Sequence, residues 1–212
     1  MWLIPSGRDS SPASPIPGGN VTGTSFQNVE GAGKSVELLK TVIPQLRLVA
    51  VLWNPANPVY GAQMVKQTEA AARSLGIQLR MLAARYAKEI DSAFGSMTGE
   101  RAEGLTVIVD PVFTAHLTRI AALASDSHLP SISAFREYAE AGGLMAYAAS
   151  FSERGRRTAI YVDRILRGAN PANLPVEQPE KFELVINLKT AKALGLTIPP
   201  SLLLRADQVI DP

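Results

Sequence analysis

Hydrophobic positions along the chain alternate between two spacings, and this alternation predicts a series of strands and helices. Leu46–Trp53 is an almost uninterrupted apolar run, which is typical of a strand buried on both faces. Tyr60–Leu75 has apolar side chains at helical spacing and stops before Gly76, a residue type that commonly ends helices. Further strands are expected at Val21–Phe26, Ile77–Ala83, Leu105–Val109, Pro130–Ala134, Leu144–Ala149 and Phe182–Ile186, and further helices at Gly31–Ile43, Glu89–Thr98, Thr114–Ser125, Ser152–Arg167 and Leu188–Leu194.

Strands that alternate with helices of this length predict the α/β class, with a parallel, doubly wound sheet. Right-handed crossovers then place helices on both faces of the sheet. Ser150 and Glu153 have the spacing of a capping box, and Asn187 is expected to cap the helix that follows it. A proline-rich connection, Pro171–Pro179, suggests that the chain leaves the first sheet and contributes to a second body.

Composition removes several classes of function. The 212 residues include no cysteine and two histidines, so disulfides, thiolate zinc sites and a cysteine nucleophile are excluded, and no metal or cofactor is expected. The formal net charge of +2 does not favour nucleic acid as a partner. The first apolar run stops at Ile4, short of a signal peptide, and no stretch has the length of a membrane span.

The most informative polar and aromatic residues follow the expected strands. In open parallel sheets, ligands bind outside the carboxyl ends of the strands. Arg136 there could take a carboxylate, and Asp110 or Glu137 an ammonium group. The same residues could instead be turn formers, core aromatics and solvated charges. The predicted ligand-binding set, with no catalytic member, is Trp53, Asn54, Asn57, Asp110, Phe113, Phe135, Arg136 and Glu137.

Two other motifs point weakly to enzymes. Asn28–Ser35 has the lysine and serine of a phosphate-binding loop, but asparagine replaces its first glycine. The alternative function is therefore a phosphate- or nucleotide-handling α/β enzyme that uses Asp110 and Lys34. Gly23–Gln27 lacks the last glycine of a nucleophile elbow around Ser25, so a serine hydrolase is not supported.

Four segments carry a resemblance to a known family: Pro17–Gly23, Trp53–Pro58, Phe135–Tyr147 and Lys181–Leu196. They resemble the ABC-transporter substrate-binding proteins that include tryptophan and tyrosine binders. The resemblance implies a type I periplasmic binding fold, in which two α/β lobes close on a ligand. It also implies a non-enzymatic protein that binds a small solute (an aromatic or other amino acid, or a small carboxylate), a membrane ABC permease as partner, and a periplasmic or extracytoplasmic location.

Family members carry an export signal and most of their first lobe before the Pro17 motif, so the sequence resembles a truncated member. The expected domains are a linker tail (1–19), a crossover strand to a partial lobe 1 (20–30), a complete lobe 2 (31–143), and a returning part of lobe 1 with a C-terminal tail (144–212). A one-walled cleft predicts weak ligand binding. Unpaired edges at Val21–Phe26 and Phe182–Ile186 would favour a homodimer. The missing signal leaves a cytoplasmic location as the alternative.

Overall fold

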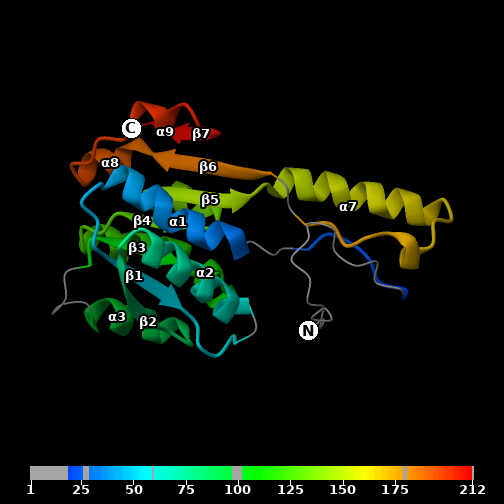
Figure 1. Cartoon of the computed structure of the whole chain (residues 1–212), viewed down its shortest axis with the longest axis horizontal. Coiled ribbons are helices and arrows are strands. Elements are labelled where there is room, and N and C mark those ends of the chain that lie inside the picture. Colours follow the sequence, from blue (N-terminus) through cyan, green and yellow to red (C-terminus); the bar gives the residue numbers. More distant parts are fainter. Residues whose placement is uncertain (1–18, 26–28, 59, 97–101, 179–180, 212) are drawn as a thin grey trace. The chain divides into compact units, whose positions relative to one another are not determined.

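The computed structural model describes residues 19–25, 29–58, 60–96, 102–178 and 181–211 (Figure 1). Its contacts divide the chain into two units. Unit 1 combines Met1–Gln27 with Ala149–Lys181, and unit 2 combines Asn28–Ala148 with Phe182–Pro212. The chain therefore passes from one unit to the other three times.

Unit 2 is built on a mostly parallel sheet of seven strands in the order β2-β1-β3-β4-β5-β6-β7. Parallel pairs join β1 to β2 and β3, β3 to β4, β4 to β5, and β6 to β7. The predicted α/β class with a parallel sheet is confirmed. The strands are β1 (Leu48–Trp53), β2 (Gln78–Ala83), β3 (Gly104–Val107), β4 (Ser131–Ser133), β5 (Met145–Ala149), β6 (Phe182–Asn187) and β7 (Gln208–Ile210).

Strand β6 runs antiparallel to β5. The backbone N–H of Asn187 donates to the Leu144 carbonyl at 2.9 Å, and the N–H of Ser150 donates to the Lys181 carbonyl at 3.0 Å. Along this pairing the residue numbers of β5 rise while those of β6 fall, so the two strands are antiparallel. The chain thus leaves the sheet after β5 and returns beside the same strand.

The expected domains placed 144–212 in lobe 1, whereas the contacts of the structure divide this segment between the two units. The segment Phe182–Pro212 belongs to the unit that also contains 28–148. The physical reason is that β6 is an apolar strand, buried from Leu184 to Asn187, with a hydrogen-bonded neighbour on each side. The expectation that Phe182–Ile186 would lack sheet neighbours is therefore wrong.

Helices cover both faces of the sheet in unit 2, since Leu39 of α1 packs with Met145 on one face and Ala139 of α6 packs with Ala146 on the other. A Cβ atom at Gly104 would lie 3.5 Å from the Leu39 side chain of α1. Gly104 is paired with Val49, so α1 covers the sheet face that these two residues share. Val49 and Leu39 share one core cluster with Ile132 and Met145. The helices of this unit are α1 (Val29–Val42), α2 (Tyr60–Ser74), α3 (Ala87–Gly95), α4 (Pro111–Thr114), α5 (Leu117–Asp126), α6 (Arg136–Glu140), α8 (Leu188–Ala193) and α9 (Pro200–Leu203).

Most predicted elements of unit 2 are present, with three differences. The expected helix 114–125 is divided between two helices. Pro111 starts α4, which ends with its cap at Ala115, and α5 begins at Leu117. Arg136 begins the short helix α6, which the pattern did not predict. Helix α9 and strand β7 lie in the region expected to form the C-terminal tail.

Unit 1 contains the helix α7 (Phe151–Leu166) and a short 3-10 turn, Pro171–Asn173. The expected strand Val21–Phe26 is reduced to a single parallel bridge between Thr24 and Glu177; Phe26 lies outside the described residues, as do residues 1–18 of the expected tail. Only Tyr161 is buried on α7, and large apolar side chains such as Val162 and Leu166 are exposed. None of the helices in the described ranges combines the length and apolarity needed to cross a bilayer.

A tight contact between Gly143 and Tyr138 gives a test of the unit 2 core. A Cβ atom at Gly143 would lie 2.2 Å from Cε1 of Tyr138, whose ring is fully buried. Burial raises the pKa of the Tyr138 phenol, which stays protonated and donates to Ser131 Oγ at 2.7 Å. The ring therefore has no free space to move into.

We expect Gly143→Ala to lower the free energy of unfolding by about 3 kcal/mol, because overpacking a buried ring forces the backbone to shift. Urea unfolding followed by tryptophan fluorescence measures this change. Gly95→Ala is the matched control, since a Cβ at Gly95 meets no heavy atom within 4 Å. Equal stabilities of the two variants would contradict the described packing.

Candidate functional site

The predicted site residues that the structure brings together surround the carboxylate of Asp110. This side chain is 3% exposed and follows β3. Its Oδ1 accepts from Asn54 Nδ2 at 3.1 Å and from the backbone N–H of Val112 at 2.9 Å. Its Oδ2 accepts from Asn57 Nδ2 at 3.1 Å. Three neutral donors thus satisfy the buried Asp110 side chain, as buried polar groups require.

The local sequence explains this geometry. Asn54 follows β1, and its Oδ1 accepts from the N–H of Ala56 at 2.9 Å, which is the side-chain bond of an Asx turn. That turn brings Asn57 back over the strand end, where its N–H bonds to the Asn54 carbonyl at 3.2 Å. Asp110 caps α4, and Pro111 occupies the first helical position. Since β1 and β3 are adjacent and parallel, their carboxyl ends place Asn54 beside Asp110.

Trp53 adds an unusual donor to this edge of the sheet. It is the last residue of β1 and is paired with Ala83 of β2. Its indole Nε1 is buried and has no hydrogen-bond partner among the described residues. A buried N–H without a partner costs about 1–3 kcal/mol. The indole N–H of Trp53, at the end of β1, is therefore a candidate for a bond to a bound molecule.

The other predicted residues do not join this cluster. Phe113 is fully buried, and Phe135 is 9% exposed. Arg136 is exposed, and its guanidinium contacts Glu140, Glu183 and Gln208, on the side of β6 and β7. Glu137 is an exposed residue of α6. These four residues fit the simpler interpretation, in which the aromatics belong to the core and the charges to the surface.

The enzyme alternative finds no support in this geometry. Gly31–Ser35 lie inside α1, where Ser35 Oγ donates to the Gly31 carbonyl at 3.0 Å, so these residues do not form a phosphate-binding loop; Asn28 lies outside the described residues. Lys34 pairs with Glu37 of the same helix, and no described hydrogen bond or ion pair joins it to Asp110. Within the described ranges no group of three or more acidic or histidine side chains could hold a metal ion.

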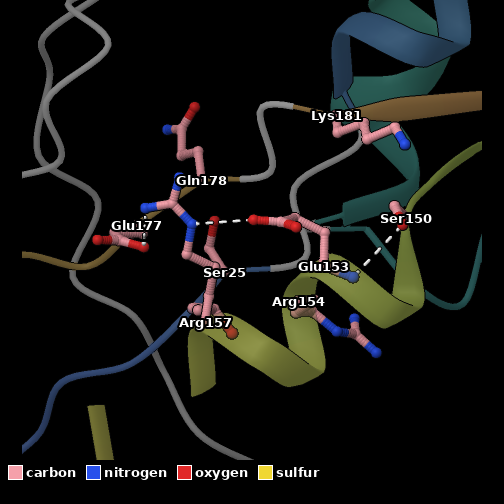
Figure 2. A pocket seen from close by; sticks show the side chains of 9 residues that line it. Ser25, Ser150, Glu153, Arg154, Arg157, Glu177, Gln178 and Lys181 are labelled. Carbon is pink, nitrogen blue, oxygen red and sulfur yellow. Dashed lines mark hydrogen bonds and ion pairs between the residues drawn. The ribbon is translucent and has the colours of Figure 1, made fainter. Parts of the chain in front are cut away.

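A second candidate site lies within unit 1 and was not predicted as a binding site. It is a cavity of about 280 Å³ beside the first turns of α7 (Figure 2). Ser150 caps the helix by accepting from the N–H of Glu153 at 3.4 Å, which confirms half of the predicted capping box. The lining residues are Thr24, Ser25, Ser150, Glu153, Arg154, Arg157, Glu177, Gln178 and Lys181.

Charged residues that line this cavity form ion pairs with one another. Arg157 contacts Glu153 and Glu177, each at 3.3 Å, and Arg156 also contacts Glu153. The hydrogen bond from Arg156 holds the pKa of the Glu153 carboxyl below its ordinary value, so Glu153 is ionised at neutral pH. The sequence held one signal for this site, the Ser150–Glu153 spacing. The pairing of Arg157 with Glu177 depends on the return of the chain and has no local signal.

The Asp110 cluster predicts a large effect of one substitution on stability. Asp110→Ala removes a helix cap and leaves the buried amide of Asn54 without its acceptor, so we expect unfolding to become easier by about 3 kcal/mol. Urea unfolding measures the loss. Asp126→Ala is the control, because Asp126 is exposed at the end of α5. An unchanged midpoint for Asp110→Ala would contradict the buried network.

Known proteins share both the sequence pattern and the fold. A family model described as "ABC transporter substrate binding protein" matches residues 12–210. A tyrosine-binding protein of Clostridioides difficile (strain R20291) is 24% identical over 181 residues, which is 85% of this chain and 51% of that protein.

Two solved structures are similar over most of this chain. An ABC domain in complex with L-Trp from Streptococcus pneumoniae is 30% identical, with a TM-score of 0.83, over 94% of this chain and 66% of that one. A conserved domain protein from Vibrio cholerae O1 biovar El Tor is 29% identical, with a TM-score of 0.81, over 92% of this chain and 64% of that one.

This chain spans about half the length of the curated relative and slightly less than two thirds of each of the two solved chains. The family model nevertheless matches almost all of this sequence, including both strand ends that meet at Asp110. The chain belongs to the ABC transporter substrate-binding protein family.

Proposed function

We propose that this protein binds a small solute for an ABC transporter, the solute being an aromatic or other amino acid or a small carboxylate. The observation that carries the proposal is the buried Asp110 carboxylate between Asn54 and Asn57, at the carboxyl ends of β1 and β3. Ligand sites of open α/β sheets lie at such ends. The names of two relatives, a tyrosine-binding protein and a domain in complex with L-Trp, support an amino acid as the solute.

The chemistry of the cluster suits a zwitterion. Each carboxylate oxygen has more than one acceptor position, so Asp110 can accept from an ammonium group while it keeps its amide donors. A charge-assisted bond of this kind is stronger than a bond between neutral groups. The buried Trp53 N–H is a donor of the type that a solute carboxylate accepts. Together these groups would orient an amino acid at this edge of the sheet.

Membership of the family supports a membrane ABC permease as the partner and an extracytoplasmic location as the place of action. The relatives are longer than this chain.

We also propose that the chain forms a homodimer. Strand β2 lies at one edge of the sheet, and an uncovered edge can pair with another chain. Sedimentation velocity should then show a dimer whose fraction rises with concentration, whereas a monomer at every concentration would contradict it.

Calorimetric titration of the chain with L-tryptophan and L-tyrosine tests the solute proposal. We expect binding of at least one of them, and a loss of about tenfold or more in affinity in Asp110→Asn, because the charged acceptor of the ammonium group is removed. Indole-3-propionate lacks that ammonium group, so its affinity should not fall in the same variant. The exposed Asp126→Asn is the matched control and should bind as the unaltered protein does.

Two results would overturn the proposal. One is the absence of both heat and a ligand-dependent rise in melting temperature with amino acids and aromatic acids at concentrations of about 10 mM, since any ligand of the folded state raises its stability. The other is an equal affinity for L-tryptophan in Asp110→Asn and Asp126→Asn, which would place the ammonium group elsewhere.

A further inference from the structure

We propose that the cavity at the start of α7 is a second binding site, which takes a small oxyanion such as an organic carboxylate or a phosphate ester. This site lies within unit 1, whereas Asp110 belongs to unit 2. The proposal does not rest on the proposed solute site. It rests on a buried hydroxyl, on the balance of charges, and on the helix that begins at the cavity.

The buried hydroxyl is that of Ser25. The residue is 8% exposed, and its Oγ is buried with no hydrogen-bond partner in the described structure. Its backbone is held in place, because its N–H donates to the Glu177 carbonyl at 2.7 Å. Figure 2 shows the side chain pointing into the space bordered by Glu153 and Gln178. A hydroxyl fixed in this position has a bond to offer to a molecule in the cavity.

The charges around the cavity favour an anion. The carboxylates of Glu153 and Glu177 are both engaged by Arg157, and Glu153 also by Arg156, so their negative charge is compensated. The Lys181 ammonium lines the same cavity, and no carboxylate of the described residues lies within ion-pair distance of it. Arg154 adds another cation, whose guanidinium lies 4.0 Å from the centre of the Phe151 ring. The lining side chains thus carry more positive than negative charge.

The helix adds to this field. α7 has sixteen residues, and its amino end, capped by the buried Ser150, opens on the cavity. The first turn of a helix carries a partial positive charge and attracts anions. Lys181 is fixed near this end, because its carbonyl accepts from the N–H of Ser150 at 3.0 Å. A hydroxyl, an ammonium group and a helix terminus therefore converge on one space.

The size of the cavity limits the ligand. About 280 Å³ exceeds what a bare phosphate or acetate ion fills, and it approaches the lower end of small-molecule sites. The expected ligand is therefore an oxyanion attached to a body of a few carbon atoms. The exposed amide of Gln178 at the rim can bond to polar groups of that body. Inorganic phosphate and acetate are suitable probes of the anionic part.

The test is a titration of the isotope-labelled full chain with phosphate and, separately, with acetate at constant ionic strength, followed by amide chemical shifts. We expect saturable shifts at Ser25 and at the first turn of α7. Ser25→Ala should raise the dissociation constant about tenfold, and Lys181→Gln should raise it severalfold. Ser201→Ala and Lys189→Gln, at exposed positions of unit 2, are the matched controls and should change nothing.

A second readout separates a ligand-binding role of Ser25 from a structural one. Because its hydroxyl is buried without a partner, Ser25→Ala should leave the stability of the ligand-free protein unchanged or slightly raised. A lowered stability would mean that the hydroxyl supports the fold, and it would overturn the proposal. Equal affinities in Ser25→Ala and Ser201→Ala, or no saturable shift with either probe, would also overturn it.

The titration also keeps the two sites apart. Asp110→Asn should leave phosphate and acetate binding at α7 intact, and Ser25→Ala should leave L-tryptophan binding at Asp110 intact. Preference for phosphate over acetate, or the reverse, identifies the class of oxyanion. Loss of both ligands in Asp110→Asn would show one shared site and would overturn the proposal of a second one.

Discussion

The pairing of β1 with a parallel neighbour on each of its edges is the constraint on which unit 2 depends. Its backbone groups are bonded to β2 on one side and to β3 on the other. Its inner residues, Val49 to Leu52, are fully buried. A strand with no solvent on either face or edge must be apolar throughout, and helices must cover both of its faces. Its first polar side chain, Asn54, can appear only where the strand ends.

The same constraint produces the cluster at the carboxyl edge. Because β1 and β3 are adjacent and parallel, Asn54 and Asp110 emerge side by side even though 55 residues separate them in the chain. Neutral amides hold the Asp110 charge there, whereas in unit 1 the charges of Glu153 and Glu177 are held by guanidinium groups. The first arrangement leaves a net negative charge at its site, and the second leaves a positive one.

Local patterns predicted the elements whose neighbours lie close in sequence. The run Leu46–Trp53, the helix before Gly76 and the caps at Ser150 and Asn187 are all observed. The Asn54–Asp110 contact followed from the carboxyl-end rule. The placement of Phe182–Pro212 did not follow from any local pattern, because the sequence of an apolar strand does not indicate which sheet the strand joins. Spacing also does not reveal which way a charged side chain points. The partners of Arg136 in the structure are Glu140, Glu183 and Gln208.

The antiparallel pairing of β5 with β6 also bears on how the molecule opens. The segment that carries α7 leaves and returns between Ser150 and Lys181, whose backbones are bonded to each other. Its ends are thus held together whether or not the segment itself is ordered. With Tyr161 as the only buried residue of α7, that segment has little apolar burial to resist local unfolding. We expect amide protons of α7 to exchange well before those of β1, because local opening of this segment requires less free energy than unfolding of the sheet.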